Sequence, residues 1–366
     1  MRVLVLARRS DLPWYGFAYG SALVRLGARL CYLDEDTPPN ATIQEIVEQF
    51  PERPDLIYCP ELHGCPIPSG LTTIDIPTLN VNEDTYAYTD RRIRWSMLFD
   101  YTLLFHPGFE DRFRAAGHPR PMFLPLAVDG DTIEGPEEER TIEIGFVGRT
   151  NSNMYVTRRR VLSMLDRHFQ MNDWRRRYSS EEMAAIYRLS KIMINIPRED
   201  YLQEANMRVF EVMGSGALLL TRLPTELSDI GFQEGVHFIG FRREEELVPL
   251  IHHFLANDAA RLEIAGKGRE LVWREHTYDC RVAKLLDQLR SDAGQLLAPS
   301  RRWKEEQVAL AYLDHYSAHM FLNRARQEWK AIARRDLVKA AVGGSLLAKS
   351  YARRVRGRLV SCLTNH

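Results

Sequence analysis

Long apolar runs are missing from this sequence. A helix needs about 20 consecutive apolar residues to cross a bilayer, and no segment of the 366-residue chain provides them. The apolar run at the amino terminus spans only a few residues before Arg8 and Arg9, which is too short for a secretory signal peptide and favours a first strand. We therefore expect a globular protein with no membrane span, located in the cytoplasm.

Paired cysteines are missing as well. The five cysteines are dispersed and include no CxxC pair, a pattern typical of reduced thiols in a cytoplasmic protein. Only Cys59, His63 and Cys65 lie close together, but their spacing fits no common zinc site and a fourth ligand is missing. The sequence therefore predicts neither a metal ion nor a bound cofactor.

Net charge is zero overall but unevenly distributed. Residues 301–366 carry 14 Lys and Arg against 5 Asp and Glu, so a basic tail follows an acidic body. Between residues 337 and 363, Leu347, Tyr351 and Val355 share one helical face with Leu359 and Cys362. This pattern permits binding to an anionic membrane surface at the inner face of the membrane, while packing on the body or on a partner chain is an equal alternative. We expect no nucleic-acid partner.

Strands and helices alternate along the chain. Residues 1–34 and 142–168 each begin with a strand, continue through a glycine-containing turn and enter a helix, which is typical of parallel sheets built from βαβ units. Ser179 and Glu182 form a candidate capping box at the start of a later helix. We predict an α/β protein with an N-terminal doubly wound domain (1–130), a linker (131–140), a second such domain (141–292) and a basic helical tail (293–366).

Three features of the second domain fall where loops leave the carboxyl ends of parallel strands, the usual place for a phosphorylated ligand. The first is the turn at Gly148 and Arg149, followed by a helix that begins with three arginines, Arg158 to Arg160. The second is the segment with Arg198. The third is a helix that begins at Asn206 and carries Arg208 and Glu211 in its first turns. Arg208 at a helix amino terminus suits a diphosphate, and Glu211 suits the vicinal hydroxyls of a ribose.

The stretch "NMRVFEVMGSGALLLT" (206–221) resembles a known family at this point. Together with "KIMINI", "EGVHFIGF" and "HTYDCRVAKLL", it is similar to the C-terminal half of CgeB-like spore-coat glycosyltransferases, relatives of glycosyltransferase family 4. "NVNEDTYAYTD", "FDYTLLFHP" and "FLPLAVD" extend the likeness over most of residues 1–290, but not to the tail. The resemblance implies the GT-B fold: two Rossmann-like domains facing across a cleft, with a nucleotide-sugar donor on the second and an acceptor on the first.

The resemblance also implies roles for particular residues. Glu211 would contact the ribose, and the position that faces the donor sugar falls on Gln203, where the family-4 pattern has a glutamate. The basic pair of that pattern would fall on Arg149 and one of the three helix arginines, for which we take Arg159. Gly148, Asn206 and Arg208 complete the predicted donor site.

The first domain is expected to supply the acceptor side and any catalytic base. Asp84 follows one strand and is the leading candidate to position or activate the acceptor, with His106 and His63 after other strands as further candidates. Two DxD strings, at 34–36 and 129–131, are interpreted as turns rather than metal sites.

The sequence thus predicts a metal-independent glycosyltransferase that moves a hexose-like unit from a nucleoside diphosphate sugar. Its acceptor would be a component of the cell envelope, a glycan, a lipid or a protein. Two alternatives remain open at this stage: a nucleotide-sugar epimerase of similar form, and a non-catalytic scaffold with a degenerate glycosyltransferase fold. The retained Arg208 and Glu211 oppose the scaffold, whereas Gln203 favours it.

Overall fold

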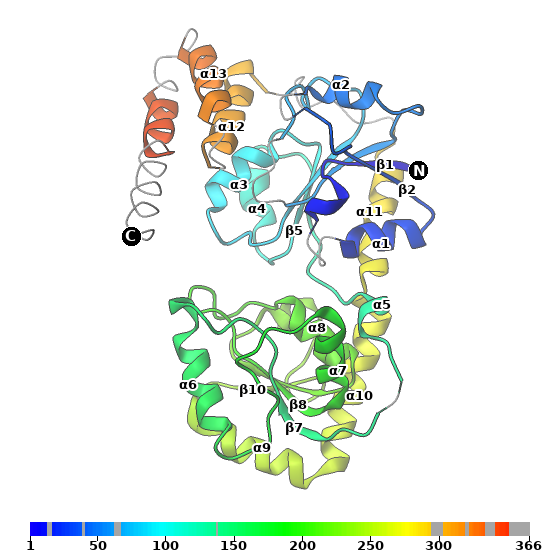
Figure 1. The fold of residues 1–366 in the computed structure, drawn as a ribbon, viewed down its shortest axis with the longest axis vertical. Helices are drawn as coiled ribbons and strands as arrows, with labels where there is room; N and C mark the ends of the chain where they lie inside the picture. The colour runs from blue at the N-terminus through cyan, green and yellow to red at the C-terminus, as the bar shows by residue number, and fades with distance from the viewer. Residues whose placement is uncertain are drawn as a thin grey trace. The chain divides into compact units, whose positions relative to one another are not determined.

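The computed structural model describes residues 1–12, 17–38, 41–61, 67–136, 138–293, 303–318, 322–333 and 341–350. The chain divides into two compact units (Figure 1). Unit 1 comprises Met1–Leu124 and Leu286–His366, and unit 2 comprises Pro125–Leu285. Each unit is built on its own parallel sheet.

Unit 1 contains a six-stranded sheet in the order β2-β1-β3-β4-β5-β6, in which all neighbouring strands are parallel. The order changes direction once, at β1. The strands are β1 (Arg2–Val5), β2 (Arg29–Tyr32), β3 (Leu56–Cys59), β4 (Thr78–Asn82), β5 (Tyr101–Leu104) and β6 (Pro121–Phe123). The helices between them are α1 (Phe17–Arg25), α2 (Ile43–Glu48), α3 (Thr89–Ser96) and α4 (Glu110–Ala115).

Unit 2 contains a four-stranded parallel sheet in the order β10-β9-β8-β7. Its strands are β7 (Ile142–Gly145), β8 (Ser190–Asn195), β9 (Leu218–Arg222) and β10 (Ile239–Phe241). Its helices are α5 (Gly130–Ile133), α6 (Val156–Leu165), α7 (Ser180–Leu189), α8 (Met207–Gly214), α9 (Leu247–Ala256) and α10 (Asp258–Glu275), and α11 (Tyr278–Ser291) follows. These elements confirm the α/β prediction.

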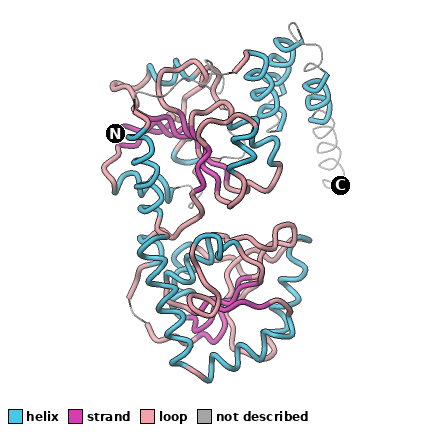
Figure 2. Tube along the Cα trace, turned by 180° about the vertical axis from the view of Figure 1, so that it is seen from behind, coloured by secondary structure: helices cyan, strands magenta, loops and turns pink. Residues whose placement is uncertain are grey.

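Alternating side chains place helices on both faces of the unit 2 sheet. In β8, Met193 packs with a cluster that includes residues of α7, α8 and α10. Its neighbours Ile192 and Ile194 point to the other face, where they pack with residues of α6 and α9. Figure 2 shows the strands enclosed between these helices. A strand buried on both faces explains why Ile192, Met193 and Ile194 form an unbroken apolar run.

Local signals in the sequence set the ends of several elements. The predicted capping box is present: the Glu182 N–H donates to Ser179 Oγ at 3.2 Å, and the Ser179 N–H donates to Glu182 Oε2 at 2.8 Å. After α8, Gly216 adopts φ +76°, the left-handed conformation that glycine allows, and the chain enters β9. The capping box confirms the sequence prediction.

The predicted linker is wrong in part, because residues assigned to it belong to the unit 2 core. Ile133, at the end of α5, is buried with side chains of α7 and α8. Before it, the Val128 N–H donates to the His276 carbonyl and the Tyr278 N–H donates to the Val128 carbonyl, both at 3.0 Å. Unit 2 therefore begins near residue 125 rather than 141, and the "DGD" string at 129–131 leads into α5 instead of forming only a turn.

The predicted separate tail is also wrong for its described helices. Helices α12 (Glu305–Ala318) and α13 (Leu322–Ala333) pack into unit 1, where Tyr312 and Tyr316 are buried with Ile67 and Leu71. The hydroxyls of both tyrosines donate to backbone carbonyls in the 67–68 segment, at 3.0 and 2.9 Å. Apolar residues of the tail therefore complete the core of the first unit.

The membrane expectation lies mostly outside the described residues. Within 337–363, only the helical segment 341–350 is described; there Leu347 packs against the unit 1 core and the Ser350 hydroxyl donates to the Ser317 carbonyl at 2.7 Å. In the described ranges, no helix has the length and hydropathy of a membrane span. His63 and Cys65 likewise lie outside the described residues.

A buried carboxylate fastens α12 to α3. Asp314 is fully buried and forms ion pairs with Arg91 at 3.3 Å and Arg94 at 2.8 Å. We expect Asp314→Ala to lower the free energy of unfolding by about 2 kcal/mol, because both guanidinium groups lose a charged acceptor. Urea unfolding measures this change. Asp75→Ala, which removes an exposed partner of Arg53, is the control and should change stability by less than about 0.5 kcal/mol; equal losses in the two variants would contradict the assignment.

Candidate functional site

The loop after β7 is held by a side-chain clamp. The Phe146 N–H donates to Asn172 Oδ1 at 2.8 Å, and Asn172 Nδ2 donates to the Phe146 carbonyl at 2.9 Å. Phe146 is fully buried, so the clamp fixes the point at which the chain leaves the sheet. Two residues later, Gly148 lies beside the end of the Arg208 side chain: a Cβ atom at 148 would lie 2.6 Å from Arg208 Nη2.

Helix α8 begins at Asn206, which stands at the N-cap with φ −69° and ψ 168°. The expected capping bond is not formed. The Asn206 amide instead turns toward β8, where its Nδ2 donates to Asn195 Oδ1 at 3.1 Å. The Asn206 Oδ1 atom is buried and accepts no hydrogen bond from the described part of the chain. A buried acceptor without a donor is costly, so this atom indicates a ligand position.

Arg208 in the first turn of α8 is partly buried and pre-positioned. Its Nη1 donates to Asn195 Oδ1 at 2.9 Å, and its guanidinium lies 5.3 Å from the centre of the Phe146 ring. Among the described residues, Asn195 alone accepts a hydrogen bond from this guanidinium. A guanidinium has five N–H donors, so most of them remain for an anion.

The three consecutive arginines of α6 have different surroundings. Arg158 is buried and donates to the carbonyls of Ile196 and Arg149, at 2.6 Å each. Burial, and then the charge of Arg208, lower the pKa of Arg158 to about 9, which leaves it charged at neutral pH. Arg158 therefore adds positive charge to the region and also holds two loops together.

Arg159 and Arg149 remain predicted nucleotide contacts. Arg159 Nη1 donates to the carbonyls of Thr150 and Ser152, at 2.5 and 2.6 Å, and so braces the loop before α6. The Arg149 side chain is exposed. Arg160 is also exposed and pairs with Glu244, away from the loop carbonyls.

Glu211 lies one turn beyond Arg208 and is buried. The Tyr187 hydroxyl donates to Glu211 Oε2 at 2.9 Å. Burial raises the pKa of Glu211, while the bond from Tyr187 and the charge of Arg208 oppose that shift. The tyrosine orients the carboxyl group and occupies one of its oxygens.

In the segment before α8, Gln203 and its neighbour Glu204 have different surroundings. The Gln203 side chain is exposed and its Nε2 donates to the Tyr201 hydroxyl at 3.1 Å, while that hydroxyl donates to Glu226 at 2.6 Å. Glu204 is buried, and its charge acts on Arg158. The buried carboxylate of this segment is thus Glu204, one residue after the predicted position.

In unit 1, Asp84 and His106 come together as the sequence predicts for the ends of neighbouring parallel strands. Asp84 follows β4 and His106 follows β5, and a carboxylate oxygen and a ring nitrogen of the two lie within 4.8 Å. His106 is buried. Its ring and the Tyr86 ring form an edge-to-face contact, with their centres 5.0 Å apart. The ring contact limits how the histidine can turn.

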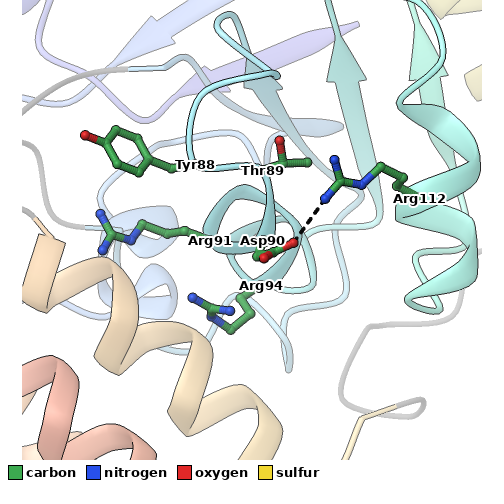
Figure 3. A pocket seen from close by; sticks show the side chains of 6 residues that line it. All are labelled: Tyr88, Thr89, Asp90, Arg91, Arg94 and Arg112. Atoms are coloured by element: carbon green, nitrogen blue, oxygen red, sulfur yellow. Dashed lines mark hydrogen bonds and ion pairs between the residues drawn. The ribbon is translucent and has the colours of Figure 1, made fainter.

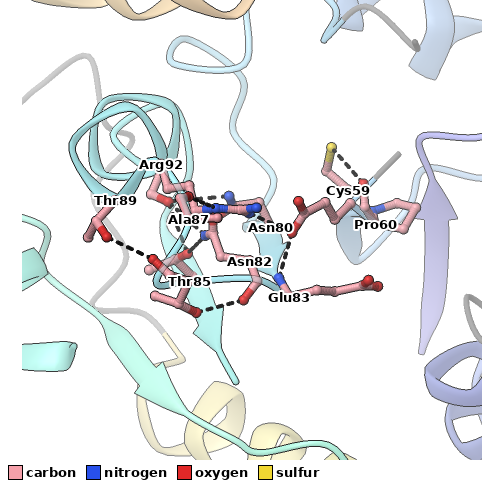
Figure 4. Close-up of polar contacts among 12 residues, drawn as sticks. Cys59, Pro60, Asn80, Asn82, Glu83, Thr85, Ala87, Thr89 and Arg92 are labelled. Carbon is pink, nitrogen blue, oxygen red and sulfur yellow. Dashed lines mark hydrogen bonds and ion pairs between the residues drawn. The ribbon is translucent and has the colours of Figure 1, made fainter. Parts of the chain in front are cut away.

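Next to Asp84, a second carboxyl group is held in a polar cluster (Figure 4). Glu61 Oε2 accepts from the Glu83 N–H at 2.5 Å and from Arg92 Nη1 at 2.7 Å. The Glu83 carboxyl group points away from Arg92. Burial, with the carboxylates of Glu61 and Asp84, raises the pKa of Glu83 to about 8, and Arg92 only partly offsets this.

Comparison with known proteins gives a family match for part of unit 2. Residues 151–287 match the model of a family described as glycosyl transferase-like, and this range contains α8 with Arg208 and Glu211. No curated protein sequence gives a significant match to the chain.

Solved structures match the fold of this chain over about four fifths of its length. Sucrose-phosphate synthase from Thermosynechococcus elongatus matches with a TM-score of 0.54 and 11% identity, over 81% of this chain and 100% of that one. Anabaena HepE, solved in complex with UDP and glucose, matches with a TM-score of 0.55 and 10% identity, over 80% and 100%. A glycosyltransferase from Rickettsia africae gives 0.53 and 10%, over 81% and 99%. At such low identity these matches show the fold, which is the predicted GT-B fold.

Some site residues were missed from the sequence. Asn195 ends β8 and accepts hydrogen bonds from both Asn206 and Arg208, a role that the sequence analysis does not predict. Its signal was a polar residue directly after the apolar run "KIMI". Tyr187 and Asn172, which hold Glu211 and Phe146, gave no local signal because they lie in other segments of the chain.

The raised pKa of Glu83 predicts a pH dependence of stability. Glu83 keeps its proton in the folded state up to about pH 8, whereas its ordinary pKa is 4.5. The folded state therefore binds more protons between these values, and this contribution to the free energy of unfolding falls as the pH rises through that window. We expect Glu83→Gln to flatten the dependence between about pH 5 and pH 8.

Urea unfolding across that pH range measures the effect, with Glu52→Gln, an exposed partner of Arg2, as the control. The control should keep the wild-type slope. A Glu83→Gln slope equal to that of the wild type would show that this carboxyl group is ionised throughout the range.

Proposed function

We propose that this chain is a glycosyltransferase that transfers a sugar from a nucleoside diphosphate sugar without a metal ion. The observation that carries the proposal is the start of α8. There, within the described residues, the Arg208 guanidinium donates only to Asn195, and the neighbouring Asn206 Oδ1 accepts no hydrogen bond. The glycosyl transferase-like match over residues 151–287 supports it, as does the UDP complex of the structural relative HepE.

The diphosphate would lie at the amino terminus of α8. Backbone N–H groups there carry partial positive charge, and Arg208 adds a charge-assisted, bidentate contact. When the glycosidic bond breaks, negative charge develops on the departing diphosphate. Arg208, with the nearby charge of Arg158, stabilises that charge more in the transition state than in the ground state. This arrangement assigns to guanidinium groups the role that a metal ion has in other transferases.

Glu211 would bind the ribose of the donor. Its Oε2 is engaged by the Tyr187 hydroxyl, so the second carboxyl oxygen is the acceptor offered to a ribose hydroxyl. The position of Glu211, one helical turn after Arg208, matches the step from diphosphate to ribose within one nucleotide. Gln203 is exposed, and we propose Glu204 as the carboxylate that acts on the donor-sugar end of the site.

Asp84 and His106 would act on the acceptor. Asp84 would accept the proton of an acceptor hydroxyl or orient it, and a ring nitrogen of His106 lies within 4.8 Å of its carboxylate. The finer family assignment, CgeB-like, remains part of the proposal, as do the glycan, lipid or protein acceptor and the cytoplasmic location. The free thiols of Cys31 and Cys280 suit a reducing compartment.

Removing Arg208 should weaken nucleotide binding and turnover together. We expect Arg208→Ala to lower turnover of the accepted nucleotide sugar about 100-fold, because a preorganised charged donor is lost, and to weaken binding of UDP or GDP at least tenfold. Glu211→Gln, which still accepts from Tyr187, should weaken nucleotide binding about tenfold.

Calorimetric titration with UDP and GDP measures the binding. Turnover is measured by the release of nucleoside diphosphate from a panel of UDP and GDP sugars in the presence of EDTA. Arg242→Ala, which alters an exposed arginine of unit 2, is the control. Binding that is unchanged in Arg208→Ala would refute the donor site. No nucleotide binding by the wild type would favour the scaffold, and a changed sugar without an acceptor would identify an epimerase.

Gly148 should be required for the position of Arg208. A Cβ atom at 148 would lie 2.6 Å from Arg208 Nη2, and the guanidinium can move away at little cost to the fold. We therefore expect Gly148→Ala to weaken UDP or GDP binding about tenfold, and to lower the free energy of unfolding by about 1–2 kcal/mol because φ +156° is unfavourable for a residue with a Cβ. Gly266→Ala in α10, where a Cβ would meet no atom within 4 Å, is the matched control; wild-type affinity in both variants would exclude this role.

A further inference from the structure

Unit 1 has a pocket of about 340 Å³ at the start of α3, lined by residues to which the proposed mechanism gives no role so far. Six residues line it: Tyr88, Thr89, Asp90, Arg91, Arg94 and Arg112. In Figure 3, Tyr88 and Arg91 extend to one side of the first turn of α3, and Arg112 reaches Asp90 from α4 on the other side. Three guanidinium groups therefore surround one helix terminus.

Two of the three arginines are fixed by a carboxylate behind them. Asp314 of α12 is fully buried and pairs with Arg91 and Arg94, at 3.3 and 2.8 Å. A guanidinium that binds Asp314 at one edge keeps further N–H donors for another partner. Asp314 thus positions the two arginines without occupying all of their donors.

The third arginine, Arg112, pairs with an exposed carboxylate. Arg112 pairs with Asp90 at 3.2 Å, and the two side chains are 52% and 81% exposed. An exposed pair of this kind contributes little to stability, so a doubly charged anion can replace the Asp90 carboxylate at low cost. A phosphate offers three oxygens, which match guanidinium donors in bidentate geometry.

Tyr88 adds an aromatic wall to the pocket. It adopts φ +55°, a conformation that is uncommon for a residue other than glycine, and its side chain is largely exposed. The Arg91 guanidinium lies 5.4 Å from the centre of its ring. An exposed ring held beside a charged group presents a flat apolar surface to the C–H face of a sugar.

We propose that this pocket binds a phosphorylated saccharide, with the phosphate on Arg112, Arg91 and Arg94 and the sugar ring on Tyr88. The inference rests on the proposed function, because it assigns to unit 1 an acceptor that carries a phosphate. The amino terminus of α3 adds partial positive charge at the same point. Asp90 is the one carboxylate lining the pocket, and it opposes binding.

Calorimetric titration of glucose 6-phosphate, inorganic phosphate and glucose tests the pocket. We expect glucose 6-phosphate to bind more tightly than phosphate, and glucose alone to bind far more weakly. Arg112→Ala should weaken the binding of glucose 6-phosphate about tenfold, and Tyr88→Ala should weaken it less. Asp90→Asn should tighten the binding. The opposite signs of the Arg112 and Asp90 changes separate a specific site from general loss of structure.

Arg114→Ala is the matched control, because Arg114 lies on the same helix with the same 52% side-chain exposure and does not line the pocket. Arg208→Ala, titrated in parallel, should retain glucose 6-phosphate binding, which excludes the donor site as its location. Equal affinities in Arg112→Ala and Arg114→Ala, with UDP or GDP still bound, would overturn the pocket and leave the proposed function intact. Glucose 6-phosphate binding that depends on Arg112 without any nucleotide binding would overturn the proposed function instead.

Discussion

The candidate donor site depends on one buried carboxamide. Asn195 ends β8, is completely buried, and donates from Nδ2 to Thr221 of β9 at 3.0 Å. Its Oδ1 accepts from both Asn206 and Arg208 at the start of α8. A single side chain thus ties two strands to the first turn of the helix. Because the sheet is rigid and buried on both faces, the positions of Asn206 and Arg208 follow from it, and an anion would meet donors that need little rearrangement.

Burial also shifts the pKa of two carboxyl groups in the candidate sites. Glu211 and Glu83 lie in different units, yet burial is the main reason that the pKa of each is raised. Their neighbours differ: Glu211 has Tyr187 and Arg208, which favour its charged form, whereas Glu83 has the carboxylates of Glu61 and Asp84, which disfavour it. The first group therefore suits a hydrogen-bond acceptor for ribose. The second keeps its proton up to about pH 8.

Much of the fold could be predicted from the sequence because its signals are local. Strand–turn–helix alternation, the capping box at Ser179 and the glycine after α8 each depend on residues close together in the chain. The packing of α12 could not be predicted in this way. A helical pattern shows which face of α12 is apolar, but not that Tyr312 and Tyr316 bury that face against the 67–71 segment. The same limit applies to Asn206: its residue type indicated a cap, and the competing acceptor that redirects it, Asn195, lies in another element.

The arginines of α6 show why residue type alone does not assign a site. Arg158, Arg159 and Arg160 are adjacent and chemically identical, and a helix points them in three directions about 100° apart. One is buried against Ile196, one braces the loop at Thr150, and one is exposed beside Glu244. The buried member cannot readily leave its carbonyl partners, because those carbonyls would then be unsatisfied in the interior. Its charge nevertheless reaches the site through a medium that screens it poorly. In the proposed site, Arg158 would therefore act on a bound anion through its field, while Arg208, whose guanidinium donates only to Asn195 among the described residues, would contact it.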